Sequence, residues 1–268
     1  MTQTVAPSAV LFLDCTQRES VLVLAPSPSD GGAPFARRFD AQSKSGEGER
    51  FWLELAGLFD EAGLSAAALS GVAVATGPGG FTGLRVSIAC AKAIAFARGI
   101  PAVGVPSAAV FAASDAARGG RGPWLVALAS KAGSAWATAV AGSPEEITAG
   151  AHGFCEGAIV AEDAFARLAA DTAARGGAVL ADEHLDPVLA ACVARTGAAL
   201  RGLSVEPHAA RALAHGALAR VVPSGGPGGD DARGRSTSFG SPFALEPLYA
   251  REPEAVTNWR LRRADRGS

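Results

Sequence analysis

The sequence predicts an α/β protein made of two related halves, each with a mixed β-sheet flanked by helices. Three features support this fold class: an apolar strand pair opens the chain over residues 9–24, strands and helices then alternate, and a second strand pair follows near residue 124. A helix between two strands is typical of parallel pairing in α/β domains. The chain has 268 residues, of which 49% are hydrophobic, so it can bury a large core.

The first strand pair is predicted from two apolar runs, 9–13 and 21–24. The polar residues 15–20 between these runs suit a hairpin connection. Asp14 ends the first strand at this turn, where a carboxylate most commonly caps its own turn. Residues 35–40 are predicted to form a third strand.

The most distinctive stretch is a turn rich in glycine between a strand at 72–76 and a helix at 82–97. We call it the glycine turn, and its residues are Gly77, Pro78, Gly79, Gly80, Phe81, Thr82 and Gly83. Leu84 and Arg85 stand where a phosphate-binding loop has Lys and Ser or Thr, and the glycine spacing does not match the dinucleotide pattern either. A tight strand-to-helix turn and a functional loop with free backbone amides both stay open. Phe81 is expected either to pack against the helix or to project into a partner.

The helix after the glycine turn carries two stripes of side chains. The stripe expected to face the core consists of Leu84, Ile88, Ala91 and Ala95. The second stripe is mixed and consists of Arg85, Ala89, Lys92 and Phe96. Ser87, Cys90 and Ala93 are expected to keep the remaining surface small, which allows another helix to approach closely. The helix is therefore predicted to lie between two layers, or between one layer and a partner.

The other elements are predicted from apolar periodicity and from Gly and Pro at their ends. Helices are expected at 49–62, 65–69, 107–117, 161–174, 187–195 and 206–222, and strands at 100–105, 124–129, 135–141 and 178–180. No element is predicted for residues 142–157. The chain is accordingly divided into a first subdomain (1–105 plus 206–221), a second subdomain (106–205), a flexible linker (222–242) and a C-terminal segment (243–268).

Composition argues against several classes of protein. The 24 basic and 26 acidic residues leave no basic excess for a nucleic-acid surface. No signal-peptide pattern opens the chain, and the apolar segment 82–97 is too short to span a bilayer. We therefore expect a cytoplasmic protein with no membrane contact. The scattered cysteines are expected to be buried free thiols, as suits a reducing cytosol, and they are Cys15, Cys90, Cys155 and Cys192.

The glycine turn resembles the TsaB (YeaZ-like) family, and the order of elements resembles the actin, sugar kinase and Hsp70-type ATPase superfold. The family resemblance is carried by Gly77-Pro78-Gly79-Gly80-Phe81-Thr82-Gly83-Leu84-Arg85, by Ala91-Lys92, by Ile100-Pro101-Ala102-Val103-Gly104-Val105 and by Pro247-Leu248-Tyr249-Ala250-Arg251. The resemblance is close over residues 71–111 and fair over 10–25. It implies two related actin-like (ribonuclease H-like) subdomains.

The resemblance also implies a function: a non-catalytic subunit of the bacterial machinery that makes threonylcarbamoyladenosine in tRNA. Such a subunit pairs with the catalytic subunit TsaD and the ATPase TsaE, pairs with itself when alone, and meets tRNA only through the complex. It needs no cofactor by itself, and ATP at the interface of the complex stays open. Asp14 and Thr16 are the expected remnant of a nucleotide loop. The expected partner interface consists of Phe81, Thr82, Leu84, Arg85, Ala89 and Lys92.

Several positions depart from the family pattern. The Asp-Thr-Ser that usually follows the first strand reads Asp14-Cys15-Thr16, and residues 45–49 replace the His-Ser at the first helix. The second half has Ala129-Ser130-Lys131-Ala132-Gly133 where a motif with a carboxylate is expected, and Gly-Asp-Gly is reduced to Gly176-Gly177-Ala178. These losses argue against independent phosphate chemistry.

Two enzymes of the same superfold are alternatives. A TsaD-type metalloenzyme, or the glycoprotease activity once attached to this superfamily, would need a His-x-x-x-His pair of metal ligands. No two histidines lie four residues apart, so no metal site is expected; they are His152, His184, His208 and His215. A small-molecule kinase would need carboxylates from both halves to hold magnesium, and only Asp14 remains.

Overall fold

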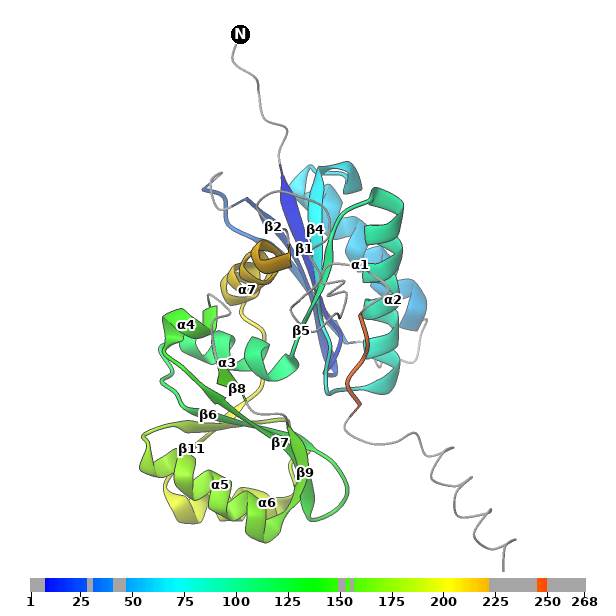
Figure 1. The fold of residues 1–268 in the computed structure, drawn as a ribbon. Coiled ribbons are helices and arrows are strands. Elements are labelled where there is room, and N and C mark those ends of the chain that lie inside the picture. The colour runs from blue at the N-terminus through cyan, green and yellow to red at the C-terminus, as the bar shows by residue number, and fades with distance from the viewer. Residues whose placement is uncertain are drawn as a thin grey trace, which may run out of the picture.

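Two separate β-sheets form the framework of the chain (Figure 1). The computed structural model describes residues 8–27, 31–40, 47–148, 153–154, 157–221 and 245–249. The first sheet has the order β3-β2-β1-β4-β5, with β1 (Ala9–Asp14), β2 (Glu19–Pro26), β3 (Phe35–Asp40), β4 (Leu69–Ala75) and β5 (Ala102–Val105). The second has the order β11-β10-β6-β7-β8, with β6 (Trp124–Ala129), β7 (Ser134–Ala141), β8 (Gly153–Phe154), β10 (Ala178–Ala181) and β11 (Ala199–Gly202), and β9 (Ala158–Ala161) also pairs with β7.

The two halves repeat the same topology. In each half the first three strands pair antiparallel and two later strands add in parallel, so β1, β4 and β5 correspond to β6, β10 and β11. The helices correspond as well: α1 (Glu47–Ala62) to α5 (Glu162–Ala174), α2 (Phe81–Arg98) to α6 (Pro187–Thr196), and α3 (Ser107–Ala117) to α7 (Pro207–Val221). The predicted fold of two related halves with mixed sheets is confirmed.

The strands that the sequence did not predict are short and lie away from the centre of the second sheet. Residues 142–157, for which no element was predicted, contain the helix α4 (Pro144–Thr148) and β8. β9 includes Ala161, which was expected to begin a helix. All four residues of β11 are exposed, so it lacks the apolar alternation that identifies a strand in a sequence. The expected linker at 222–242 and most of the C-terminal segment lie outside the described residues.

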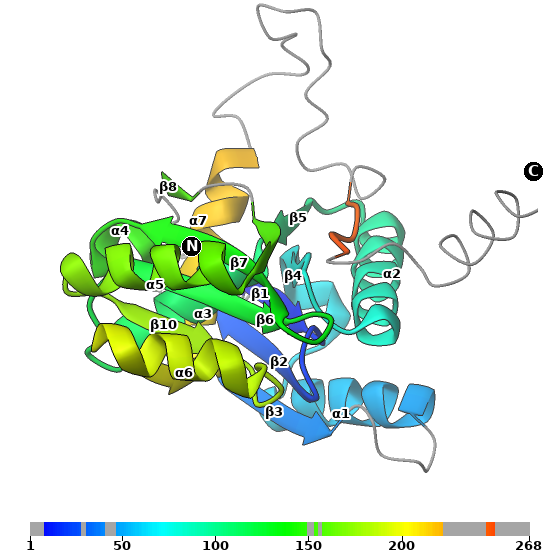
Figure 2. The ribbon, with the colours of Figure 1, turned by 90° about the horizontal axis from the view of Figure 1, so that it is seen from below.

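The two halves share a hydrophobic core. On one face of the first sheet, α1 and α2 cover Leu11, Leu13 and their neighbours. On the other face, α3 and α7 lie between the sheets, and one continuous cluster joins Phe12 of β1 to Trp124 of β6 through Phe111 of α3. Helices α5 and α6 lie side by side over the second sheet (Figure 2). Separating the halves would therefore expose apolar surface, at a cost of about 25 cal/mol per Å².

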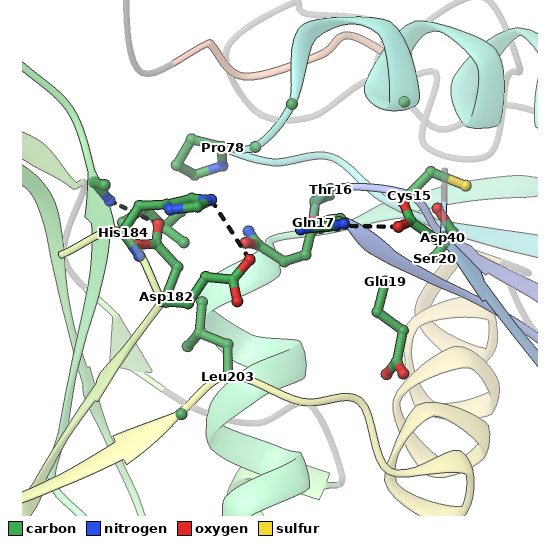
Figure 3. A pocket seen from close by; sticks show the side chains of 18 of the residues that line it. Cys15, Thr16, Gln17, Glu19, Ser20, Asp40, Pro78, Asp182, His184 and Leu203 are labelled. Carbon is green, nitrogen blue, oxygen red and sulfur yellow. Dashed lines mark hydrogen bonds and ion pairs between the residues drawn. The ribbon is translucent and has the colours of Figure 1, made fainter. Parts of the chain in front are cut away.

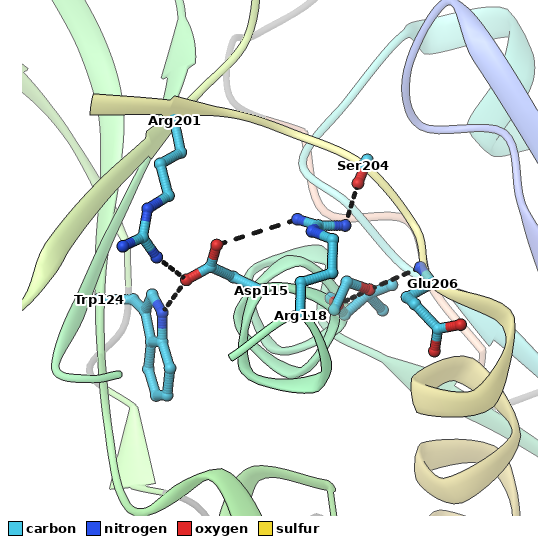
Figure 4. A network of polar contacts seen from close by, with 8 residues as sticks. Asp115, Arg118, Trp124, Arg201, Ser204 and Glu206 are labelled. Atoms are coloured by element: carbon cyan, nitrogen blue, oxygen red, sulfur yellow. Dashed lines mark hydrogen bonds and ion pairs between the residues drawn. The ribbon is translucent and has the colours of Figure 1, made fainter. Parts of the chain in front are cut away.

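A buried aspartate ties together the two connections between the halves (Figure 4). Asp115, in α3, accepts hydrogen bonds from Trp124 Nε1 at 2.8 Å and from Arg201 of β11 at 2.6 Å. Arg118 reaches the other carboxylate oxygen and also donates to Ser204. Because Asp115 is almost fully buried, these charged and polar donors are what make its ionised form tolerable there.

Replacing Asp115 with Ala should destabilise the fold. The Asp115→Ala variant leaves Arg201 and the indole N–H of buried Trp124 without their acceptor, so we expect the free energy of unfolding to fall by about 2 kcal/mol. Chemical denaturation followed by circular dichroism measures this loss. The control is Asp171→Ala, which removes an exposed ion pair to Arg175 at 3.6 Å and should cost less than about 0.5 kcal/mol. Equal losses in the two variants would contradict the role given to Asp115.

Candidate functional site

A large cavity lies between the two halves, at the carboxyl ends of the parallel strands of both sheets (Figure 3). Its volume is about 2060 Å³. Four segments line most of it: the β1–β2 turn, the glycine turn, the loop after β10 and the end of β11. Ligands of open α/β sheets bind outside the carboxyl ends of strands, so this cavity is the place where a ligand could contact both halves.

The predicted nucleotide-loop remnant lies at the edge of this cavity. Asp14 Oδ1 accepts hydrogen bonds from the backbone N–H of Thr16 at 2.9 Å and from its hydroxyl at 2.7 Å, so the carboxylate caps its own turn. Asp14 is only 2% exposed, and its Oδ2 has no partner among the described residues. This side chain borders a second, small cavity of about 30 Å³. Burial raises the pKa of Asp14 above its ordinary value, although the bonds from Thr16 oppose that shift.

The glycine turn packs directly against the β1–β2 turn. A Cβ atom at Gly83 would overlap the carbonyl oxygen of Cys15, and one at Gly79 would overlap that of Thr16. The N–H of Gly80 donates to Thr16 O at 2.8 Å, so this amide is used within the chain. Gly77 alone in the turn has positive φ, at 101°. Close backbone approach therefore explains Gly79 and Gly83, and Gly77 combines such an approach with positive φ.

Two aspartates that the sequence analysis missed hold the second half's hairpin loop. Asp182 accepts hydrogen bonds from the N–H of Ala129 at 2.7 Å and of His184 at 3.0 Å. Asp186 accepts from the N–H of Gly133 at 2.7 Å and of Val188 at 2.9 Å, and these bonds lower its pKa. The second half thus brings a carboxylate, Asp182, to the cavity even though the loop after β6 has none. The position of Asp182 directly after β10 and that of Asp186 directly before Pro187, as the N-cap of α6, were the signals that could have identified them.

The predicted partner-interface residues on α2 divide between surface and core. Phe81, Thr82, Arg85 and Ala89 are exposed, and Lys92 is half-buried. Leu84 was predicted both on the core stripe and in the partner interface. It is 0% exposed and packs in the core beneath α2, so the first prediction is confirmed and the second is wrong. Ser87 and Cys90, expected to keep the outer surface small, are buried as well. The exposed face instead consists of Thr82, Arg85, Ala89, Ala93, Phe96 and Ala97, which we call the α2 face.

An aromatic cluster marks the start of the α2 face. The rings of Phe81 and Tyr249 lie 5.1 Å apart between centroids, and the guanidinium carbon of Arg85 lies 3.8 Å from the Phe81 ring centroid. Arg85 Nε donates to the Tyr249 hydroxyl at 3.1 Å. Phe81 stays 43% exposed, so it both packs on its own chain and faces outward. Tyr249 was identified from the sequence only as part of a family motif, because 164 residues separate it from Arg85.

The helix pairs of the two halves differ in how closely they pack. α5 and α6 contact each other, whereas the corresponding α1 and α2 make at most marginal contact. The large cavity extends between the first turns of α1 and α2, where Phe51 and Val86 line it. Among the described residues, the first half therefore lacks the helix-to-helix contact that α5 and α6 make in the second half.

The described residues contain no group of three His, Cys, Asp or Glu side chains arranged to hold a metal ion. Within the same part of the chain, no helix has the length and hydropathy to cross a membrane.

Cys15, Cys90 and Cys192 are buried free thiols, as predicted, and Cys155 lies outside the described residues. Burial raises the pKa of Cys15 and of Cys90 to about 12, so neither is a reactive thiolate at neutral pH.

Replacing Asp14 with Asn should stabilise the fold at neutral pH. A raised pKa means that the ionised carboxylate costs folding free energy at a pH above that pKa, and that the cost disappears below the ordinary value of 3.8. In Asp14→Asn the amide oxygen can still accept from Thr16 without a buried charge. Thermal denaturation should give a higher Tm for this variant than for the parent at pH 7, and the difference should shrink toward pH 4.

Asp186→Asn is the control of opposite sign. Its lowered pKa means that the ionised form stabilises the fold, and this stabilisation is lost as the pH falls through the lowered pKa. This variant should therefore have a lower Tm than the parent at pH 7. A lower Tm for Asp14→Asn at pH 7 would show that the Asp14 charge is compensated and would contradict its assignment as a costly buried group.

Comparisons with known proteins agree with this architecture. Two solved structures resemble most of the chain. The first is described as an uncharacterized protein with similarity to the peptidase YEAZ from Pseudomonas aeruginosa. Its TM-score is 0.65 at 20% sequence identity, and the match covers 91% of this chain and 100% of that one. The other, YeaZ from Pseudomonas aeruginosa, has a TM-score of 0.62 at 19% identity and covers 90% and 99%. They confirm the fold that the resemblance implied. No curated protein sequence matches the chain.

A protein-family model matches residues 49–259, and its description is tRNA N6-adenosine threonylcarbamoyltransferase, TsaD. The matched stretch contains the glycine turn, α2 and the whole second half. Since it extends over well more than half of the 268 residues, the chain belongs to the TsaD family.

Proposed function

We propose that the chain is a non-catalytic subunit of the machinery that adds threonylcarbamoyl to tRNA adenosine. In this role it pairs with a TsaD-like catalytic subunit and works with a TsaE-like ATPase, and tRNA contacts it only through the complex. Family membership supports the pathway, and the fold shared with YeaZ supports the TsaB-like role within it. The open α2 face is the observation that carries the assignment as a pairing subunit.

The α2 face has the composition of a helix-packing surface. Ala89 and Ala93 are exposed near the middle of α2, and Phe96 is 71% exposed toward its end. Small side chains allow the axes of two helices to approach to about 8 Å, and a few well-packed apolar residues supply most of the energy of an interface. The corresponding helix of the second half, α6, packs against α5. We infer that α2 packs against a partner, and that a second copy takes this place when the catalytic subunit is absent.

Independent catalysis is disfavoured by the way the chain uses its chemically active side chains. No two of its four histidines have the spacing of a metal-binding helix pair. Asp182 lines the cavity, but each of its carboxylate oxygens already accepts a backbone hydrogen bond. One carboxylate oxygen of Asp14, Oδ1, accepts hydrogen bonds from Thr16, and the other, Oδ2, is buried. A kinase needs carboxylates that are free to hold magnesium, and neither aspartate is arranged in that way.

The Ala89→Arg substitution should abolish pairing. A bulky cation at this exposed position does not disturb the core but would overlap the partner helix and bury an unpaired charge, so we expect affinity to fall by at least about 100-fold. Size-exclusion chromatography and calorimetry with the TsaD-like subunit of the same cell measure the loss.

The matched control is Ala170→Arg, at an exposed position of α5 in the other half. It should leave pairing unchanged. If Ala89→Arg is folded and binds with the affinity of the parent, the interface lies elsewhere and the proposed use of α2 fails.

Co-purification tests the function as a whole. We expect the full chain to co-purify with the TsaD-like subunit, and the comparison with and without ATP decides whether nucleotide contributes at the interface of the complex. The isolated chain should show no magnesium-dependent ATP turnover above that of an Asp14→Asn variant. Turnover at an enzyme-like rate that Asp14→Asn removes would instead establish the kinase alternative.

A further inference from the structure

The charge of α2 has one sign. Its 18 residues include Arg85, Lys92 and Arg98 and contain neither Asp nor Glu. Arg98 donates to the carbonyl oxygen of Ala67 at 3.0 Å. Within the described part of the chain, none of these three cations forms an ion pair with a carboxylate. The α2 face and the cations beside it therefore combine small apolar residues with positive charge that no carboxylate of the described residues pairs.

Arg85 is held in place by the aromatic cluster. Its guanidinium lies over the Phe81 ring, and its Nε donates a hydrogen bond to the Tyr249 hydroxyl. These two contacts fix the side chain, and no described residue accepts a hydrogen bond from the terminal amino groups of the guanidinium. A fixed guanidinium loses little side-chain entropy on binding, and its planar pair of donors matches a carboxylate.

We propose that the α2 face, together with the half-buried Lys92 at its edge, selects a partner by charge: it binds a helix surface that carries carboxylates, with Arg85 and Lys92 as the anchoring residues. This inference rests on the proposed pairing function and adds the chemistry of the partner to it. Ala89 lies between the two cations on the helix, so the close approach that Ala89 permits brings both of them against the partner surface. At such short range, opposite charges attract and like charges repel more strongly than on a free surface.

The same charges oppose self-pairing through α2. A parallel two-fold contact centred on Ala89 would set each cation beside the same cation of the other copy. In an antiparallel two-fold contact, the two helices run in opposite directions through Ala89. Arg85 lies four residues before Ala89 and Lys92 three residues after it, so Arg85 of one copy lies beside Lys92 of the other. This arrangement places like charges together. The face is consequently better suited to a carboxylate-bearing partner than to a second copy.

The test measures two affinities as a function of salt for the parent chain and two double variants. One variant neutralises the anchors, Arg85→Gln with Lys92→Gln, and the other reverses them, Arg85→Glu with Lys92→Glu. Calorimetry gives the affinity for the TsaD-like subunit, and analytical ultracentrifugation gives self-association. The control is Arg167→Gln with Arg175→Gln at α5, which removes the same charge from the other half.

For the parent chain, affinity for the TsaD-like subunit should fall about tenfold between about 0.05 M and about 0.5 M NaCl, because salt screens exposed charge pairs. The neutralised variant should bind about tenfold more weakly at low salt with little salt dependence, and the reversed variant should not bind. The neutralised variant should also self-associate more tightly than the parent at low salt. The control should behave as the parent does.

Three results would overturn the proposal. The first is a parent affinity that does not change with salt, or a neutralised variant that keeps the parent's affinity and salt dependence. The second is tighter partner binding by a Glu252→Gln/Glu254→Gln variant. This result would mean that carboxylates of the same chain, just beyond Tyr249 in sequence, bind the α2 cations and compete with the partner. If the TsaD-like subunit does not bind the parent at any salt, the proposed function fails and self-association alone decides the charge proposal. An unchanged self-association of the neutralised variant at low salt is then the third result.

Discussion

The contact between the glycine turn and the β1–β2 turn is the constraint on which the candidate site depends. Gly79 and Gly83 let two backbone segments meet where any Cβ would overlap a carbonyl oxygen of Cys15 or Thr16. This approach sets the start of α2 against the end of β1. It thereby places Phe81 at the mouth of the cavity and turns the exposed stripe of α2 outward. A bulkier turn would shift α2 as a unit, because helix and strand pack through one core cluster.

The duplication of the fold gives an internal comparison. Each half builds the same sheet and the same three helices, yet the halves treat their outer helices differently. In the second half α5 packs against α6, and Phe165 and Leu189 are fully buried between the sheet and these helices. In the first half, alanines, aromatic rings and cations of α2 face outward, and no described carboxylate pairs with these cations. Because both halves have equivalent topology, this difference comes from side chains and not from the fold, which is why α2 is the surface assigned to a partner.

Four aspartates at the cavity and at the junction of the two halves are used by the fold itself. Asp14 caps a turn, Asp182 and Asp186 hold the β6–β7 loop, and Asp115 ties the two connections between the halves. Each therefore has a structural use visible in its hydrogen bonds. A rigid pairing subunit needs fixed loops and a fixed angle between halves, whereas a kinase needs carboxylates free to coordinate magnesium.

The sequence by itself determined the fold class, most strands and helices, the glycine turn and the family resemblance, since these depend on local patterns: apolar periodicity, glycine placement and motif spacing. It also placed Arg85, Ala89, Lys92 and Phe96 on one stripe of α2, and the structure shows this stripe exposed except at Lys92, which is half-buried. Only the tertiary structure decided that Ser87 is buried and that Leu84 belongs to the core alone, because the width of the covered side of a helix depends on what packs against it. The tertiary structure also brought Tyr249 to Arg85, Arg201 to Asp115 and Asp182 to the cavity. These contacts join residues far apart in the chain, and no local pattern records which distant side chain completes a hydrogen bond.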